Sequence, residues 1–514
     1  ASKSAEITYY INENSPHTYG QVKLLGLEKL NEEITSDIKE FLQYPSWERY
    51  VQENVQEKND GIITYLKNHG FMLAKYDSTV VKIDTLNSKT DITTFFNTGR
   101  WYTYGDIKIE KEGESSSQIS YELISYVSNI NIGDAYSEEE ISKSRLRLAR
   151  TSLFSTINLT ADTIDAVSSK ARLLIKGTVG SLNELSPEVF ADNEFGFFNV
   201  GVGASYTRKN FLGDARKFTI RARFRLNDIT NIRFDSDLFK ETLQTEVDLS
   251  AILEQPFLFS RRIAGRLEGY IKSYDISSVE YQNFGANFTA AFDMPKHTFV
   301  NLFNPYLRFD KLSYSIPESE FEGDTVSINP STFTSSLGSE IGSTTTDDLF
   351  YPTEGRILSL ISELSSANVK YDVKNLQTGI STLAVDSLGY YYKLQLSLGF
   401  YFAVSRDNKT GYIGMLSGDA ALVSPNQTFF AGGSDSVRGW RGRELIPSNQ
   451  LLNLFPQSLN EQLKIRGGNI LLEGSFEYRR KFQEDYGFVV FTDYGNTWNT
   501  FNEIRLDQIA VAIG

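Results

Sequence analysis

From residue 195 onward the chain alternates between apolar and polar residues over long stretches, and this period restricts the possible folds more than any other feature. The clearest example is 390–404. One parity holds Tyr392, Leu394, Leu396, Leu398, Phe400 and Phe402, and the other holds Lys393, Gln395, Ser397 and Gly399. Because successive side chains of a strand point to opposite faces, the pattern predicts a β-strand with one apolar and one polar face.

The same alternation recurs along the rest of the chain. The expected strands are 195–210, 218–226, 243–253, 263–271, 284–292, 306–316, 333–343, 356–364, 390–404, 411–422, 469–480 and 486–498. Several of them are about ten residues or longer, which suits a tilted crossing of a bilayer, whereas strands of soluble sandwiches most often have about five or six residues. Strand length therefore favours a transmembrane antiparallel β-barrel over a soluble β-sandwich or β-helix, with the polar parity toward the lumen.

Composition excludes several other classes of protein. The 514 residues include no cysteine, which removes disulfides and thiolate metal sites, and the net charge of −14 argues against nucleic acid as a partner. The mean hydropathy of −0.30 is that of a soluble protein. Alternating strands, however, also average to a hydrophilic value, and an aromatic content of 13% is typical of membrane girdles or a large β core.

Nothing in the sequence suggests bond chemistry. The three histidines, His17, His69 and His297, lie far apart and have no ligand spacing. We find no Ser/His/Asp arrangement and no glycine-rich phosphate motif. We therefore predict no enzyme, no catalytic residue, no cofactor and no metal.

The N-terminal third has the mixed pattern of a soluble α+β region. Residues 17–98 give the order strand, helix, helix, strand, strand, and residues 99–180 repeat it. Two consecutive copies of one unit indicate a tandem array. In the second copy, Ser137 and Glu140 form a capping box at the start of a helix predicted over 138–155.

Two flanking segments complete the predicted domain organisation. A short strand at 7–11 is expected to end a preceding unit, so residues 1–16 are assigned to that unit. Residues 181–194 contain Pro187 and four acidic residues without periodicity, and we predict that they form a linker. The predicted barrel then occupies 195–514.

One segment of the barrel region is not explained by strand physics. Residues 423–468 separate two predicted strands, far more than a hairpin needs, and loops of this length are usually functional or disordered. Glycines at 432, 433, 439 and 442 allow tight folding of the backbone. Arg438 offers a planar fork suited to a buried carboxylate. We expect a loop that folds inward and is held by a salt bridge, the alternative being a glycine-rich surface loop with incidental arginines.

The tetrapeptide Val437, Arg438, Gly439 and Trp440, preceded by Phe-Phe-Ala-Gly-Gly-Ser, resembles the inward loop of the BamA/TamA superfamily of outer-membrane barrel assembly and translocation proteins. The usual pattern there is Val-Arg-Gly-Phe or Val-Arg-Gly-Tyr, so Trp440 is a conservative departure. In that family the loop arginine reaches an acidic residue on each of the next two strands. The matching positions here are Glu477 and Asp493.

Parity supports these two positions independently of the resemblance. Around residue 477 the apolar parity is even, so Glu477 is expected to face the lumen together with Glu473 and Ser475. Around residue 493 the apolar parity is again even, so Asp493 also faces the lumen. Both carboxylates therefore point to the place where an inward-folded Arg438 would arrive.

The resemblance also implies a fold for the whole chain. The tandem α+β units resemble POTRA modules, although an unrelated α+β pair has the same element order. The turn 208–213 resembles the one that opens barrels of this superfamily, which have sixteen strands. The family has eleven strands before the loop and the sequence shows ten, so we expect one hidden strand within 293–345. A further strand begins at 509–513, so we expect the final strands to be missing from this chain.

The implied function is the insertion of other outer-membrane proteins, or the translocation of polypeptides, through a lateral seam. The first strand, 195–210, would pair weakly with the last, and Gly196, Gly201 and Gly203 would loosen it. The resemblance covers both general insertases and TamA-like specialists.

Two alternatives remain, a two-partner-type secretion pore for one dedicated substrate and a passive porin or binding barrel. The implied location is the outer membrane of a Gram-negative envelope, with the modules in the periplasm. The implied partners are the outer-membrane lipid bilayer, unfolded or extended client polypeptides, and periplasmic or accessory envelope subunits.

Overall fold

The computed structural model contains two compact units, Ala1–Ser181 and Leu182–Gly514. It describes residues 16–514 except 42–43, 166–167, 195–196, 228, 230–243, 277–278, 295–298, 315, 322–323, 349–350, 376, 380, 404–411, 424–427, 443, 448–466 and 482–485. The predicted strand at 7–11 lies outside the described residues. Within the described part of the chain, no helix is long and apolar enough to cross a membrane.

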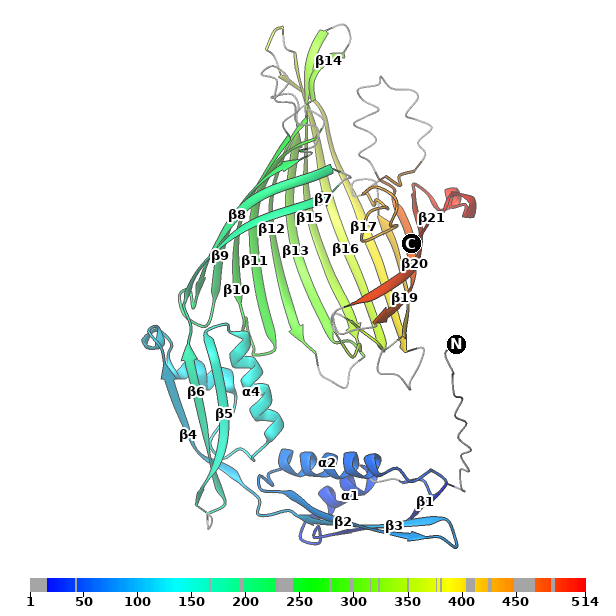
Figure 1. Cartoon of the computed structure of the whole chain (residues 1–514). Helices are drawn as coiled ribbons and strands as arrows, with labels where there is room; N and C mark the ends of the chain where they lie inside the picture. The colour runs from blue at the N-terminus through cyan, green and yellow to red at the C-terminus, as the bar shows by residue number, and fades with distance from the viewer. Residues whose placement is uncertain are drawn as a thin grey trace, which may run out of the picture. The chain divides into compact units, whose positions relative to one another are not determined.

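The first module of the N-terminal unit has the predicted order of elements (Figure 1). Its elements are β1 (Thr18–Leu25), α1 (Glu32–Phe41), α2 (Gln52–Asn68), β2 (Lys75–Asp84) and β3 (Lys89–Asn97). The sheet order is β1-β3-β2, with β1 parallel and β2 antiparallel to the central β3. Helix residues Ile38, Ile62 and Leu66 supply the buried apolar face that packs with Phe96 of β3.

The second module repeats this topology. Its elements are β4 (Thr103–Glu112), α3 (Tyr121–Ser128), α4 (Glu138–Arg150), β5 (Phe154–Asp165) and β6 (Lys170–Val179), in the sheet order β4-β6-β5. The Ser137 side chain accepts a hydrogen bond from the Glu140 amide, as its N-cap position predicts. The prediction that this helix runs to residue 155 was wrong. It ends at Arg150 because Ser152 has a φ of 56°, which turns the chain into β5.

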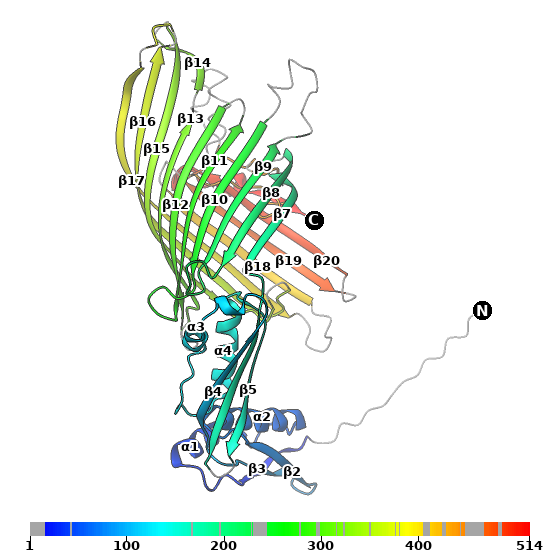
Figure 2. The same cartoon turned by 90° about the vertical axis from the view of Figure 1, so that its left-hand side faces the viewer.

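The second unit is one large antiparallel sheet of long strands (Figure 2). Its strands are β7 (Asn183–Glu194), β8 (Phe197–Lys209), β9 (Lys217–Asn227), β10 (Gln244–Gln255), β11 (Ile263–Ile276), β12 (Val279–Asp293), β13 (Leu302–Tyr314), β14 (Ile316–Phe321), β15 (Asp324–Thr344), β16 (Gly355–Asn375), β17 (Ser381–Ala403), β18 (Tyr412–Val423), β19 (Ile470–Lys481), β20 (Gly487–Trp498) and β21 (Ala510–Ile513). Each strand pairs with its neighbour in sequence, except that β14 pairs only with β15 among the described strands.

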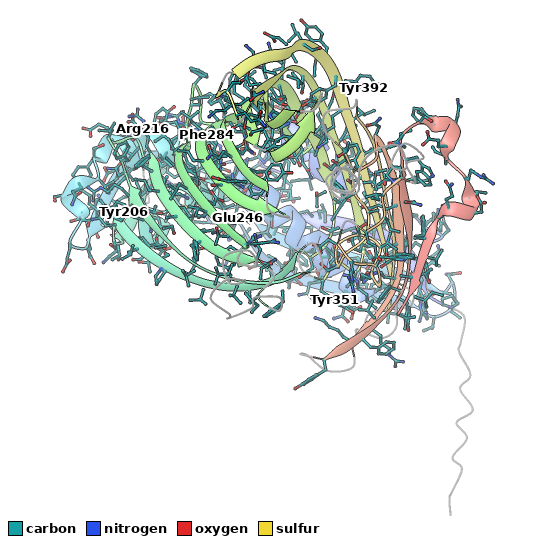
Figure 3. The ribbon with its side chains drawn as sticks, turned by 90° about the horizontal axis from the view of Figure 1, so that it is seen from above. Tyr206, Arg216, Glu246, Phe284, Tyr351 and Tyr392 are labelled. Atoms are coloured by element: carbon teal, nitrogen blue, oxygen red, sulfur yellow. The ribbon has the colours of Figure 1, made fainter. Side chains whose placement is uncertain are left out.

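The two faces of this sheet differ as the alternation predicts. Seen from above, the sheet curves around a central space (Figure 3). On β17, Tyr392, Leu394 and Phe402 of the apolar parity are exposed. On β16, Glu363 belongs to the polar parity and is buried, whereas Leu364 next to it is exposed. All twelve predicted strands correspond to strands of the structure, and the polar parity faces the inner side.

Two predictions about strand number and position were wrong, for one reason. Residues 181–194 are not a linker, because Asn183–Glu194 forms β7 and pairs along its length with β8. The strand missing from the sequence count is therefore β7 and does not lie within 293–345, where the additional element is the short β14. It follows that the predicted first strand, 195–210, corresponds to the second strand of the sheet.

Two acidic residues of β7 form ion pairs with arginines of β9. Glu188 lies 2.8 Å from Arg223 and 3.8 Å from Arg221, both on β9. Asp192 lies 3.7 Å from Arg225 on the same strand. The inward parity of β7 thus includes two carboxylates that pair with arginines two strands away. Its outward parity is apolar, with Leu185, Val189 and Ala191, but Pro187 interrupts it, and a proline within such a run argues against a strand.

Candidate functional site: the inward loop and its arginine

The described parts of the long loop are held at the base by short backbone pairings. Phe429 and Gly468 exchange two hydrogen bonds, with N···O distances of 2.7 and 2.8 Å. Ala431 and Leu445 exchange two more, at 3.3 and 3.1 Å. These are two isolated bridges. The first joins the start of the loop to Gly468, just before β19, and the second joins Ala431 to Leu445 within the loop.

Glycine is required at three positions of the loop. Gly432, Gly433 and Gly439 have φ values of 100°, 109° and 92°, in the region that favours glycine. A Cβ at Gly432 would lie 2.5 Å from the carbonyl oxygen of Arg441. The motif glycines therefore allow two segments of the loop to approach closely.

Arg438 reaches both acidic side chains at the matching positions. Its guanidinium makes a two-pronged contact with Asp493 on β20, Nε to Oδ2 at 2.6 Å and Nη2 to Oδ1 at 2.7 Å. Nη2 also lies 2.6 Å from Oε1 of Glu477 on β19. The Arg438 backbone amide donates to Oδ2 of Asp493 at 3.0 Å, so Asp493 fixes the main chain as well as the side chain.

Three further residues complete the arginine site. Ser475 Oγ accepts from Arg438 Nη2 at 3.1 Å and donates to Oδ1 of Asp493 at 2.6 Å. The guanidinium carbon of Arg438 lies 3.5 Å from the centre of the Phe491 ring, a cation–π geometry. Arg479 Nε donates to Oε2 of Glu477 at 2.6 Å. The site thus contains two arginines and two carboxylates.

Burial makes these ion pairs strong but costly to break. Asp493 is 0% and Glu477 5% exposed, so neither carboxylate can be stabilised by bulk water. Charge-assisted, two-pronged hydrogen bonds are the strong class, and a buried carboxylate without its partner is strongly destabilising. The arrangement joins the loop to β19 and β20.

Apolar packing adds a second attachment. Val437, next to the arginine, is fully buried with Ala431, Leu445 and Leu471, and Ala512 of β21 packs against this cluster. Trp440 is different, because its side chain is 39% exposed. Its backbone carbonyl accepts a hydrogen bond from the Gly433 amide at 3.1 Å. Ser436 Oγ donates to Glu473 on β19, the third lumenal residue that parity predicted.

The predicted seam glycines do not lie where the sequence suggested. Gly201 and Gly203 are on β8, the second strand, and Gly196 lies outside the described residues. A Cβ at Gly201 would collide with the ring of Phe190 on β7, and one at Gly203 would lie 3.0 Å from Cγ of Arg223. These glycines make room for inward side chains of the neighbouring strands.

Sequence reasoning identified the three charged groups but missed part of their surroundings. Phe491 and Arg479 were not predicted, although each lies two residues from a predicted carboxylate and therefore on the same face of its strand. That spacing was the available signal. Among the described residues, no group of three or more His, Asp or Glu side chains could hold a metal ion.

A family model described as the Omp85 superfamily domain matches residues 195–508, more than half of the chain. The chain belongs to the Omp85 superfamily. BamA from Haemophilus ducreyi lacking POTRA domains 1–3 superposes with a TM-score of 0.54 and 16% identity, covering 94% of this chain and 88% of that chain. At this identity the likeness shows the fold alone, POTRA-like modules followed by a large sheet. No curated protein sequence matches the chain.

Two other solved structures are similar only loosely. BamA POTRA domains 3–5 from Haemophilus influenzae give a TM-score of 0.28 and 19% identity over 32% of this chain and 68% of that chain. CdiB from Acinetobacter baumannii superposes with a TM-score of 0.37 and 12% identity, covering 98% of this chain and 83% of that chain. Neither superposition is close enough to support an argument.

Membership of the superfamily confirms the resemblance seen in the inward loop, and with it the class of fold. This Omp85 protein resides in the outer membrane, with its N-terminal POTRA-like modules in the periplasm. Proteins of this superfamily work there on polypeptide substrates and act as transporters or assembly factors.

Proposed function

We propose that this Omp85 protein inserts other β-barrel proteins into the outer membrane, and that the backbone edge of β7 is the seam at which client strands are received. The observation that carries the proposal is a difference between the two ends of the sheet. β19 and β20 are bound together by the inward loop through Arg438, whereas β7 pairs with β8 alone among the described strands.

The contacts of β7 suit a strand that must be able to separate. Its inward ion pairs with β9 involve partly exposed side chains, 26% for Glu188 and 39% for Arg223, and such pairs contribute about 1 kcal/mol or less. The outward side chains Leu185 and Val189 are 72% and 88% exposed. The backbone edge of a strand that separates from its neighbour can pair with an added strand.

The modules supply a second strand edge. In the first module the edge strand β2 exposes Val80, Val81 and Ile83. Pairing of an extended client with such an edge would satisfy backbone hydrogen bonds before the client reaches the membrane. On this proposal the loop fixed by Arg438 keeps the C-terminal strands in one arrangement while the β7 edge changes partners.

Depletion of the protein from its host cells tests the proposal. Insertion activity predicts that many outer-membrane proteins decline together in quantitative proteomics of the envelope. Loss of a single secreted protein would instead support a dedicated secretion pore. Unchanged envelope composition with altered solute uptake would support a passive porin, and either of these results contradicts the proposal.

Direct capture tests the position of the seam. The chain has no cysteine, so a single Val189→Cys substitution provides one thiol on β7. We expect disulfide capture of stalled clients that carry a cysteine in their terminal strand. Tyr392→Cys, an outward position on β17 far from either sheet edge in the strand order, is the matched control and should capture none. Equal capture at both positions would contradict a seam at β7.

A further inference from the structure

The outward face of the sheet contains a hollow of about 710 Å³ between β9 and β15. Its floor is formed by three small residues, Ala251, Gly269 and Ala286, which are direct neighbours on β10, β11 and β12. Ile220 and Phe309 close the same row on either side. Small residues flanked by large ones leave a depression in an otherwise continuous apolar surface.

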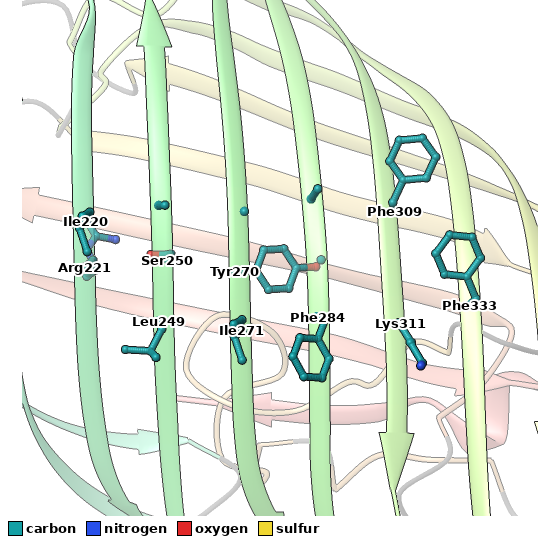
Figure 4. Close-up of a pocket in the computed structure, with 14 residues that line it drawn as sticks. Ile220, Arg221, Leu249, Ser250, Tyr270, Ile271, Phe284, Phe309, Lys311 and Phe333 are labelled. Carbon is teal, nitrogen blue, oxygen red and sulfur yellow. The ribbon is translucent and has the colours of Figure 1, made fainter. Parts of the chain in front are cut away.

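A second row of side chains borders the hollow on the side nearer the C-terminal end of β13. It consists of Leu249, Ile271, Phe284, Lys311 and Phe333, each paired with the next across the strands (Figure 4). Its apolar members are 44 to 48% exposed, and they belong to the parity that faces away from the inner polar side chains. Since this protein resides in the outer membrane, the hollow opens toward lipid.

Lys311 is the one charged side chain of this row. Arg221 also borders the hollow, but it has the inward parity and its guanidinium lies toward Glu188 of β7. In the part of the chain that the structure describes, the Lys311 ammonium has no ion pair or hydrogen bond. Lys370 on β16, two strands away in the next outward row, lies 3.5 Å from Asp386. An exposed outward ammonium without a protein partner is available to an anion from its surroundings.

The next outward row changes character. After Val247 on β10 it continues with Ser273, Gln282, Ser313 and Ser331, again paired in succession. Lys311 therefore lies at a boundary, with Phe309 on its apolar side and Ser313 on its polar side. The Gln282 amide donates to Glu280 at 3.1 Å, so an acidic group lies further out along the same face. A lysine at such a boundary extends its ammonium to the headgroup level while its stem covers apolar surface.

We propose that this hollow is a lipid-binding site, in which one acyl chain of an anionic lipid occupies the depression over Ala251, Gly269 and Ala286 and a phosphate of the same lipid pairs with Lys311. Volume, apolar lining and a single cation at the headgroup end match the two parts of such a lipid. The hydroxyl and amide groups of the next row are hydrogen-bond partners for the remaining headgroup oxygens.

The test uses the full chain purified in detergent and examined by native mass spectrometry with either phosphatidylglycerol or phosphatidylcholine. Lys311→Gln should lower retention of phosphatidylglycerol about fivefold, the factor that one basic residue supplies near an anionic lipid surface. Retention of phosphatidylcholine should change little. Gly269→Leu should lower retention of both lipids, because its side chain would fill the floor, where a Cβ meets only the Gly285 carbonyl oxygen, at 4.0 Å.

Lys370→Gln is the matched control, since it removes the same charge from the same face at a lysine that already has Asp386. It should retain phosphatidylglycerol as the unaltered chain does. Heat-modifiable migration identifies each variant as folded. Unchanged retention in Lys311→Gln, or an equal loss in Lys370→Gln, overturns the proposal. Both outcomes are independent of insertion activity, so they do not bear on the proposed function.

Discussion

Two arginines on the inner face of the sheet are each held by two carboxylates, and they differ in where the arginine comes from. Arg438 reaches Glu477 and Asp493 from a loop. Arg308 belongs to β13 itself and lies 3.0 Å from Asp310, two residues along, and 2.8 Å from Glu363 on β16. The first cluster joins a loop to the wall, and the second joins strands within the wall.

The surroundings of the two arginines differ accordingly. Glu363 keeps other partners, since Tyr306 Oη donates to it at 2.8 Å and Ser365 Oγ at 3.0 Å. Asp493 depends much more on Arg438, from which it receives three of the hydrogen bonds described above. The loss of one charged group should therefore cost less stability in the cluster of Arg308 within the sheet, here called the wall cluster, than in the cluster of Arg438 at the loop. We call the Arg308 cluster the brace, because its groups have several partners within the sheet. We call the Arg438 cluster the latch, because one arginine joins the loop to β19 and β20.

The largest effect is expected from Arg438→Ala, which leaves buried Asp493 without its arginine and buried Glu477 with Arg479 as its described cation. Breaking a buried pair in this way costs on the order of 3 to 5 kcal/mol. The loop should leave the inner face, heat-modifiability should change and insertion activity should fall, while the modules stay folded. Trypsin cleavage after Arg441 reports the release.

Arg441→Ala is the matched control for that substitution, because the described contact of Arg441 is its backbone amide with Glu444. Activity and heat-modifiability should be retained. If Arg441→Ala and Arg438→Ala behaved alike, the loop would be sensitive to any loss of arginine and the latch would have no special role.

Arg438→Lys should be the next most severe change. An ammonium keeps the charge but cannot engage Asp493 with two parallel donors while also reaching Glu477. We expect a loss of roughly 2 kcal/mol, the range of one charged hydrogen bond. The lysine variant should therefore have an insertion activity between those of the unaltered chain and Arg438→Ala. An activity equal to that of the unaltered chain would show that charge alone holds the loop.

Glu363→Gln tests the wall cluster and should have a smaller effect. Arg308 retains Asp310, and the amide oxygen can still accept from Ser365 while the amide nitrogen donates to the Tyr306 hydroxyl, so we expect a loss of about 1 to 3 kcal/mol. The denaturant midpoint of the folded sheet should fall while trypsin still fails to cut the loop. Glu340→Gln, a lumenal glutamate whose described contact is a 3.4 Å hydrogen bond from Asn304, is the control. Loop release in Glu363→Gln would contradict the distinction between brace and latch.

The smallest effect concerns a carboxylate held without any arginine, Asp347 in the turn between β15 and β16. The Thr353 hydroxyl, followed by the backbone amides of Glu354 and Thr353, lowers the pKa of Asp347 from 3.8 to about 2. Because the folded-state pKa is depressed, the stabilisation is complete above the unfolded value and is lost as pH falls from about 4 to about 2. Amide exchange of Thr353 and Glu354 should accelerate over that interval, after correction for intrinsic rates. Asp347→Asn should abolish this dependence.

Strand period carried much of the information in the sequence. The inward direction of Ser475, Glu477 and Asp493 followed from parity alone, because a strand of period two leaves no other choice. What could not be predicted depended on contacts between distant segments. β7 was missed because Pro187 interrupts its apolar parity and because its carboxylates pair with arginines on β9, a contact that the local sequence does not show. The contact of Phe491 with Arg438 likewise needs the position of a loop fifty residues upstream.

The central claim is that Arg438 holds the loop against the C-terminal strands, and a disulfide tests it most directly. A Cβ at Gly439 would lie 3.4 Å from Cβ of Ala512 on β21, close to the separation that a disulfide spans. The chain has no other cysteine to compete. The pair Gly439→Cys and Ala512→Cys should oxidise readily when Arg438 is present and poorly when Arg438→Ala is added. Because Gly439 has a φ of 92°, a cysteine there is strained in both backgrounds, so the test lies in the difference between their yields. An equal yield with and without Arg438 would contradict the account.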